Sequence, residues 1–240
     1  MNYYQEIIRK IEDNKYLVSM VPVDEIVRFG YESGLNETSK VLDLCCGYGT
    51  VLKVLYQAFG ISGVGIDLSG YAIEIGQKRL KEAGADNKIK LIYEDVTKYA
   101  DNEKYDAVIC SETIDSIENT VALGEKFLKS GGILAYQKVY SKIPNPPQEL
   151  LDFEGEVLPL SELNRIFNGL GYYITSMASD TNAMWERYIF NSHYGESDFD
   201  ELKANPGDEE RKKWFEKWRY MYFEYRRPYQ GQALFGLKKL

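Results

Sequence analysis

The chain has 240 residues, a net charge of −8 at neutral pH and a sequence pI near 5.0. This acidic balance disfavours nucleic acid as a partner, because nucleic-acid-binding surfaces are usually basic. Three cysteines, two of them adjacent, do not make a disulfide framework, no apolar stretch has the length of a membrane span, and the first residues lack a signal-peptide core. We therefore expect a soluble, cytoplasmic protein with no membrane partner.

Two helices are expected before the first strand. Residues 3–12 place large apolar side chains at helical spacing, which is typical of an amphipathic helix. A second helix is expected to begin near 22–24 and to end at the turn signal Ser33-Gly34. Residues 1–37 are therefore interpreted as an N-terminal helical segment.

Strands and helices then alternate, which predicts a parallel sheet joined by crossover helices. The expected strands span 40–45, 62–67, 88–93, 105–111 and 132–138. The expected helices between them span 49–59, 70–83 and 118–129. The proline-rich stretch 142–150 is predicted to be a loop, followed by a helix at about 160–169 and a strand at about 171–178.

The most informative segment is VLDLCCGYGT, residues 41–50. Asp43 lies inside an apolar strand pattern, and Gly47 and Gly49 follow in the turn before the next helix. Such a loop lets backbone approach a ligand closely, and the N-terminus of the helix faces that ligand. Asp67 ends the next apolar segment 20 residues after Gly47, a spacing at which a carboxylate accepts both hydroxyls of a ribose.

The details of this loop bear on the ligand. A dinucleotide site prefers a third glycine, and Leu52 stands at that position, which disfavours an NAD-dependent oxidoreductase. Asp43 suits a ligand with a cationic end better than a pyrophosphate. S-adenosylmethionine carries an ammonium, a sulfonium and a ribose, and no phosphate. A cofactor titration would decide between the two alternatives.

The segment 41–50 resembles the first motif of the class I S-adenosylmethionine-dependent methyltransferases. Four further segments resemble later motifs of the family in order, namely GVGIDLS (63–69), LIYEDVTKY (91–99), YDAVICSETI (105–114) and LKSGGILAYQ (128–137). The resemblance covers roughly residues 38–140 and is nearest to small-molecule enzymes of the ubiquinone-biosynthesis type, and to uncharacterised bacterial relatives with a C-terminal helical insertion. Cys45 stands where the family usually has its first glycine, and we expect it to avoid positive φ.

The family resemblance implies an α/β fold, a Rossmann-like seven-stranded, mostly parallel sheet with an antiparallel last strand and helices on both faces. It also implies a helical lid inserted before that last strand. The whole chain, 1–240, is then a single methyltransferase domain, with its core in 38–179 and 230–240 and the lid in 180–229.

The inserted segment 180–229 has a sequence pattern of its own. Loops of this length are uncommon unless they are functional or internally structured. Trp214, Trp218, Met221, Tyr222 and Tyr225 follow the spacing of one helix face. In the family this connection leaves the sheet beside the ligand, so the insertion is expected to roof the site. Packing of the aromatic face on the domain is the plainer alternative.

The resemblance implies S-adenosyl-L-methionine as the cofactor and S-adenosyl-L-homocysteine as its product. Matching family positions, it points to ribose binding by Asp67 and adenine contact by Asp95 and Val96, although Asp95 could instead cap a turn with Thr97. The full set of cofactor-binding candidates is Asp43, Cys45, Gly47, Gly49, Asp67, Leu68, Asp95, Val96 and Ser111.

Little catalytic machinery is expected, because a sulfonium is already activated for displacement. Holding the acceptor and the methyl group in line can supply roughly 7–11 kcal/mol, more than one general base typically adds. Glu112, at the end of the fourth strand, and His193, the only histidine, are the catalytic candidates, with a solvated or structural role as the alternative for each. No metal is expected, because the adjacent Cys45 and Cys46 lack the spacing of a zinc site.

The expected partner is a small-molecule methyl acceptor bound by aromatic side chains. The candidates are Tyr4, Tyr16, Trp185, Tyr188 and Tyr194, which suit an aromatic or cationic molecule. The accepting atom is left open, and the chain is expected to be a monomer or a homodimer. A methyltransferase acting on nucleic acid or protein, and a non-catalytic S-adenosylmethionine-binding protein, remain as alternatives.

Overall fold

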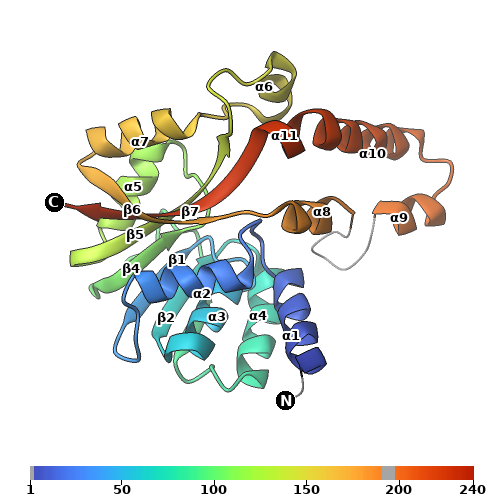
Figure 1. The fold of residues 1–240 in the computed structure, drawn as a ribbon. Helices are drawn as coiled ribbons and strands as arrows, with labels where there is room; N and C mark the ends of the chain where they lie inside the picture. The colour runs from blue at the N-terminus through green and yellow to red at the C-terminus, as the bar shows by residue number, and fades with distance from the viewer. Residues whose placement is uncertain (1–2, 191–197) are drawn as a thin grey trace.

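The computed structural model describes residues 3–190 and 198–240, which form one seven-stranded sheet with helices on both faces (Figure 1). The strand order is β3-β2-β1-β4-β5-β7-β6, and β7 runs antiparallel to β5 and β6 while the other adjacent pairs are parallel. The predicted fold class is confirmed. The strands are β1 (Lys40–Leu44), β2 (Ser62–Asp67), β3 (Ile89–Tyr93), β4 (Tyr105–Cys110), β5 (Leu128–Ser141), β6 (Tyr172–Ser179) and β7 (Gln230–Lys239).

The helices match the expected pattern in most places. They are α1 (Tyr3–Lys15), α2 (Val23–Glu32), α3 (Thr50–Phe59), α4 (Gly70–Glu82), α5 (Ile117–Glu125), α6 (Gln148–Glu154), α7 (Leu160–Gly169), α8 (Asn182–Phe190), α9 (Asp198–Ala204), α10 (Glu209–Met221), the π-helix η1 (Tyr222–Arg226) and α11 (Arg227–Tyr229). The helix expected over 118–129 ends earlier, because β5 already begins at Leu128. The stretch 142–150 is not all loop, since α6 begins at Gln148. Of the described helices, none is long and apolar enough to cross a membrane.

Two apolar cores lie on opposite faces of the sheet. Side chains of a strand alternate between faces, so Val41 joins the core under α2, α3, α4 and α8, whereas Leu42 joins the core under α5 and α7. Figure 1 shows α5 and α7 on one side of the sheet and α2, α3 and α4 on the other. The same alternation puts Asp43 on the face of Val41, at the carboxyl end of β1.

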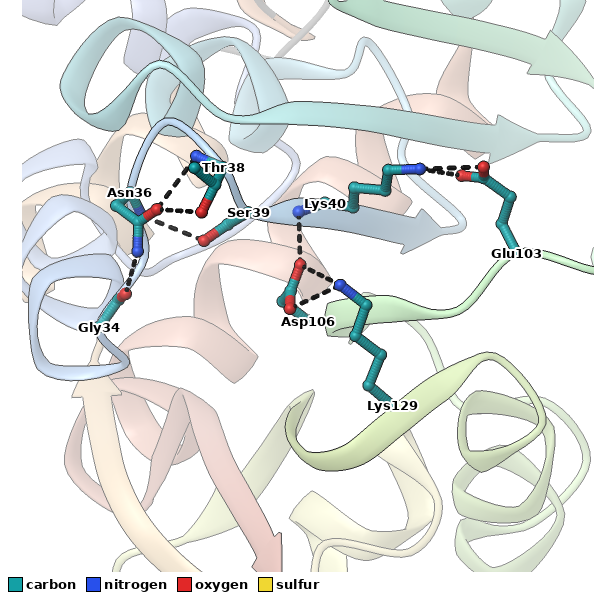
Figure 2. Close-up of polar contacts among 8 residues, drawn as sticks. All are labelled: Gly34, Asn36, Thr38, Ser39, Lys40, Glu103, Asp106 and Lys129. Carbon is teal, nitrogen blue, oxygen red and sulfur yellow. Dashed lines mark hydrogen bonds and ion pairs between the residues drawn. The ribbon is translucent and has the colours of Figure 1, made fainter.

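Polar side chains fix where β1 begins (Figure 2). Ser39 Oγ accepts a hydrogen bond from Asn36 N at 3.1 Å, which holds the turn before the strand. Asp106 Oδ2 then accepts from Lys40 N at 2.8 Å and lies 2.9 Å from Lys129 Nζ. These contacts hold the amino end of β1. The parallel pairing of β1 with β2 and β4 then determines where the strand ends and the glycine loop begins.

The glycine loop corrects one expectation from the sequence. Cys45 has a φ of 63°, so it does not avoid the left-handed region, and Gly47 and Gly49 have φ of 55° and 64°. A residue with a Cβ costs roughly 1–2 kcal/mol there. The loop is held by backbone hydrogen bonds from Cys46 N to Ile66 O at 3.0 Å and from Gly49 N to Cys46 O at 2.9 Å. The surrounding backbone therefore imposes on Cys45 the conformation that the family's glycine adopts more easily.

We expect Cys45→Gly to raise the free energy of unfolding by up to about 1 kcal/mol. Relief of the left-handed strain outweighs the greater flexibility of glycine in the unfolded chain, which costs about 0.5–1 kcal/mol. Urea denaturation at neutral pH measures the change. Cys46→Gly is the matched control, because Cys46 is buried and not at positive φ, and it should destabilise. Equal destabilisation by both variants would show that Cys45 is not strained.

Helix α1 forms where expected but does not bury its apolar face. Ile7, Ile8 and Ile11 are 38%, 58% and 59% exposed, so the helical pattern predicted the element and not its packing. Ion pairs hold its C-terminal part instead. Asp13 Oδ1 lies 2.5 Å from Lys53 Nζ of α3, and the same carboxylate also pairs with α4. The segment that follows α1 is thereby fixed near the start of α3.

The described part of the insertion is helical, but its elements have different roles. Trp214 and Trp218 of α10 pack on Phe153 of α6, with ring centroids 6.2 and 5.3 Å from that of Phe153. These two side chains therefore pack on the domain, the alternative to lining the site that the sequence left open. Figure 1 shows α10 running outward from the end of the sheet. Met184 and Trp185 of α8 join the apolar core with α2 and α3. Within the described chain, α8 is thus part of the core, and a lid role for the insertion stays a prediction.

Candidate cofactor and acceptor site

A cavity of about 440 Å³ lies at the carboxyl ends of β1, β2 and β4, where doubly wound sheets bind their ligands. Six of the predicted cofactor residues line it, namely Cys45, Gly47, Asp67, Leu68, Val96 and Ser111. Glu112, Trp185 and Tyr188 line it as well. The structure therefore brings together residues from the glycine loop, the strand ends and helix α8.

Asp43 is fully buried beside this cavity. Its Oδ1 accepts a hydrogen bond from Ser111 Oγ at 2.9 Å, and its Oδ2 has no hydrogen-bond partner among the described residues. Burial raises the pKa of Asp43 to about 7; the Asp67 charge adds to this rise and the Ser111 hydrogen bond opposes it. A buried carboxylate with an unpaired oxygen favours a positively charged donor as its missing partner.

Asp67 joins the ends of β1 and β2. Its Oδ2 accepts from Gly47 N at 2.7 Å, and its Oδ1 accepts from Ser69 N at 2.8 Å. Ser69 caps α4 by accepting from Ala72 N at 3.2 Å, so the helix cap does not require Asp67. A carboxylate has about four lone-pair sites, which leaves acceptor capacity on both oxygens for the hydroxyls of a ligand.

The end of β4 supplies the one catalytic candidate that the structure places. Glu112 is exposed, lines the cavity, and accepts a hydrogen bond from Thr113 N at 2.9 Å through Oε1. Ser111 O accepts from Gln137 Nε2 at 3.1 Å, which holds the adjoining backbone. His193, the other catalytic candidate, lies outside the described residues, so its position relative to the cavity stays a prediction.

Two cofactor candidates make structural contacts outside the cavity lining. Asp95 Oδ1 accepts hydrogen bonds from Thr97 N at 2.9 Å and from Thr97 Oγ1 at 2.7 Å. Asp95 therefore caps a turn with Thr97, the role that the sequence offered as an alternative to adenine contact. These hydrogen bonds from Thr97 lower the pKa of the Asp95 carboxyl. Gly49 precedes α3, and a Cβ there would lie 2.7 Å from Leu91 Cδ2, so packing against β3 favours glycine. Contact of Asp95 with the cofactor remains a prediction.

The aromatic acceptor candidates separate into groups. Trp185 and Tyr188 line the cavity. Tyr16 lines a second cavity of about 580 Å³ instead, where Arg79 Cζ lies 4.0 Å from its ring centroid. The side chain of Tyr4 and all of Tyr194 lie outside the described residues. Trp185 and Tyr188 thus lie at the cavity beside the cofactor candidates and Tyr16 lies at another, and contact of any of them with the acceptor stays a prediction.

Sequence reasoning missed several residues that line the cavity. Ser19 and Met20 follow α1, and Gln137 and Gln232 lie on β5 and β7. Met20 N donates to Gln232 Oε1 at 2.6 Å, which closes one wall with residues far apart in the chain. Glutamines inside apolar strands were the available signal, since a polar side chain on a buried strand face needs a partner.

Arg226, also missed, is a buried cation in the cavity lining. Its Nε lies 2.8 Å from Glu154 Oε1 and donates to Gln230 Oε1 at 2.9 Å. Its Cζ lies 4.4 and 5.0 Å from the ring centroids of Trp218 and Trp185. Burial lowers the pKa of Arg226, and the charge of Glu154 opposes this shift.

The thiols of the cysteine pair are not activated as nucleophiles. Burial raises the pKa of the Cys45 thiol to about 12, and nearby carboxylates add to the rise. Burial raises the pKa of the Cys46 thiol as well. Both shifts favour the protonated thiol, whereas nucleophilic attack needs thiolate.

These features define a class of protein. A sheet of this order, a tight loop after β1, a carboxylate at the end of β2 and a cavity at the strand ends describe an α/β domain that binds a nucleoside-containing cofactor. The unpaired Asp43 oxygen adds a preference for a ligand with a positive charge.

Comparison with known proteins finds similar methyltransferases. Residues 41–132 match the family described as methyltransferase domain. An S-adenosylmethionine-dependent methyltransferase from Geobacter sulfurreducens, solved in complex with S-adenosyl-L-homocysteine, is 25% identical. It matches with a TM-score of 0.83 over 93% of this chain and 94% of its own. Residues 41–132 therefore carry a methyltransferase domain, and the matches support the resemblance to class I S-adenosylmethionine-dependent methyltransferases.

Two curated relatives match shorter stretches. The uncharacterised protein YjhP from Escherichia coli is 28% identical over 158 residues, which are 62% of this chain and 64% of that protein. A ubiquinone biosynthesis O-methyltransferase from Nitrosomonas europaea is 30% identical over 113 residues, 46% of this chain and 45% of that protein. The chain thus spans less than two thirds of the length of either relative.

Proposed function

We propose that this protein transfers a methyl group from S-adenosyl-L-methionine to a small molecule. The observation that carries the proposal is the buried Asp43 carboxylate, whose Oδ2 has no partner among the described residues and lies under the glycine loop. An ammonium group satisfies both the charge and the hydrogen bond that this oxygen lacks. A phosphate-bearing cofactor would place like charges together at the same position.

The other residues of the loop fit the same cofactor. Asp67 retains acceptor capacity for ribose hydroxyls, and its hydrogen bond to Gly47 N fixes the loop beside it. A Cβ at Gly47 would lie 3.3 Å from Val18 Cγ2 at a φ that favours glycine, so the backbone there is kept bare. Leu68 and Val96 supply apolar surface in the cavity lining for the adenine.

Positioning is the main contribution expected from this chain. Bound S-adenosylmethionine supplies a methyl group that its sulfonium already activates. The walls of the cavity hold the acceptor and keep water out, with Trp185 and Tyr188 on the side of the insertion. Glu112 is the group placed to take a proton from an acceptor that must lose one. Alignment can lower the barrier by roughly 7–11 kcal/mol, so one weak base suffices.

Three properties support a small, non-nucleic-acid acceptor in the cytoplasm. The cavity of about 440 Å³ is in the range of small-molecule sites. The net charge of −8 disfavours nucleic acid. All three cysteines of the chain are free thiols, which suits a reducing compartment. The ubiquinone-type relative fits the same substrate class.

Mass spectrometry after incubation with S-adenosylmethionine and a metabolite extract tests the proposal. We expect formation of S-adenosylhomocysteine together with a product heavier than its precursor by one CH₂ group. Asp67→Ala is the control with weakened cofactor binding and should give much less of both. Binding of S-adenosylhomocysteine without any product would favour the non-catalytic alternative, and absence of binding would contradict the assignment of the site.

A further inference from the structure

We propose that Arg226 binds a carboxylate group of the methyl acceptor. This inference rests on the proposed function and names the chemical class of its substrate. It departs from the cationic alternative in the sequence prediction, which named an aromatic or cationic acceptor from the aromatic residues of the chain.

The charge of the cavity lining is the first argument. Among the described residues that line the cavity, the charged side chains are Asp67, Glu112 and Arg226. Asp67 is held by the glycine loop, and Glu112 lies at the end of β4. Arg226 is the one cation among the described residues of this lining, and it contacts Trp185 of the insertion, Glu154 of α6 and Gln230 of β7. It therefore marks the acceptor side of the cavity.

The hydrogen bonding of the guanidinium is the second argument. Its Nε donates to Gln230 Oε1 and forms an ion pair with Glu154, whereas Nη1 is buried and has no hydrogen-bond acceptor among the described residues. The guanidinium lies over the rings of Trp218 and Trp185, so apolar surface surrounds it. A buried charged donor without a partner is costly, and a carboxylate entering the cavity supplies that partner. If Arg226 served only to connect η1 to α6, the contact of Nε with Glu154 would be sufficient, and Nη1 would not need to be buried at the cavity.

The backbone around Arg226 is the third argument. Arg226 ends η1, and π-helical turns within helices are frequently found at functional sites. The next residue, Arg227, is exposed and pairs with Glu186 at 3.3 Å. The π turn thus separates two consecutive arginines, one buried in the cavity wall and one on the surface. Arg227 provides a matched control.

The number of charges favours a carboxylate over a phosphate. Glu154 already neutralises part of the Arg226 charge, and Glu112, Asp67 and Asp43 surround the rest of the cavity with negative charge. A dianionic phosphate would meet more repulsion than a monoanion. The planar guanidinium also matches the geometry of a carboxylate.

The experiment uses the full chain and a metabolite extract separated by ion exchange into anionic, neutral and cationic fractions. Each fraction is assayed for methyl transfer from radiolabelled S-adenosylmethionine, and the anionic fraction is assayed again after phosphatase treatment. We expect transfer to the anionic fraction, unchanged by phosphatase. Loss of transfer after phosphatase treatment would show that the anionic group of the acceptor is a phosphate, which would overturn the proposal. Transfer confined to the neutral or cationic fraction would overturn it as well.

Variants then test the residue itself. Arg226→Met should raise the KM for the anionic fraction at least tenfold, Arg226→Lys should restore part of that loss, and Arg227→Met should have no effect. Affinity for S-adenosylhomocysteine should not change in any of them. A structural role would instead lower the melting temperature and kcat without this KM effect.

Separate controls test whether the variants fold and whether the protein is a methyltransferase at all. The double variant Glu154→Gln, Arg226→Met removes both charges of the buried pair, so it tests acceptor binding without leaving Glu154 unpaired. An unchanged KM in a folded double variant would overturn the inference. No transfer to any fraction, with S-adenosylhomocysteine still bound, would contradict the proposed function and the inference with it. Transfer to uncharged acceptors would contradict the inference alone.

Discussion

Replacing Asp67 with alanine should weaken binding of S-adenosylhomocysteine by about 10- to 150-fold. Two losses add at this position. The ribose loses a charged acceptor, an interaction of about 1.5–3 kcal/mol. Gly47 N and Ser69 N also lose the carboxylate that joins them across the ends of β1 and β2. Isothermal titration calorimetry measures the affinity, and circular dichroism establishes that the variant is folded.

Asp95→Ala is the matched control for Asp67. Asp95 is also a carboxylate after a strand, but its hydrogen bonds go to Thr97 in its own turn. We expect a smaller loss of affinity there than for Asp67→Ala. A folded Asp67→Ala variant with the affinity of the wild type would refute the ribose assignment. Equal losses in both variants would mean that Asp67 contributes no more to cofactor affinity than Asp95.

Affinity for S-adenosylhomocysteine should fall as the pH drops below about 7. Asp43 has a pKa raised to about 7 in the free protein, so it becomes protonated below that pH and can no longer pair with an ammonium. The ligand's own ammonium stays protonated between pH 5 and 7. Binding must then release a proton, and the affinity decreases up to about tenfold per pH unit. Calorimetry in buffers of different ionisation enthalpy measures both the affinity and the released proton.

The stability of the free protein should show the opposite preference. Because the folded-state pKa of Asp43 is raised, its stabilising contribution is complete below the unfolded value near 3.9 and is lost as the pH rises toward 7. Asp43→Asn removes the buried charge, so at pH 8 it should raise the free energy of unfolding by roughly 1–4 kcal/mol while weakening the ligand. This residue is therefore expected to reduce stability in return for binding.

Two variants check the assignment of the titrating group. Asp43→Asn should make the affinity independent of pH between 5 and 7. Ser111→Ala removes the hydrogen bond that opposes the rise in the pKa of Asp43, so the loss of affinity should begin about 1 pH unit higher. An unchanged pH dependence in Asp43→Asn would assign the proton to another group.

The sequence predicted the features that arise from local pattern. The alternation of β1 and its neighbours, the turn at Gly47 and the carboxylate of Asp67 lie within short segments whose geometry follows from residue type and spacing. The prediction that Cys45 avoids positive φ was wrong for a physical reason. Residue preference disfavours positive φ, whereas the backbone hydrogen bonds of the loop require it. Context over several residues decided the conformation.

The acceptor side of the cavity was harder to predict, because it is assembled from distant segments. Gln232 is recognisable only once β7 lies beside β5, and Arg226 only once the helix of the insertion turns inward through η1. The aromatic spacing from Trp214 to Tyr225 suggested one continuous α-helix, and a π turn within it changes which side chains face the core. Periodicity alone does not show such a change of phase.

The contact between Met20 and Gln232 has a kinetic consequence. It joins residues 212 positions apart, so the wall that it closes cannot form until β7 has paired with β5. Contacts of such high sequence separation require the closure of a long loop and tend to form late in folding. A ligand that needs this wall stabilises the native state but not the transition state. Such a ligand should therefore slow unfolding and leave the refolding rate almost unchanged. Bound cofactor is then expected to protect the protein from transient opening and proteolysis.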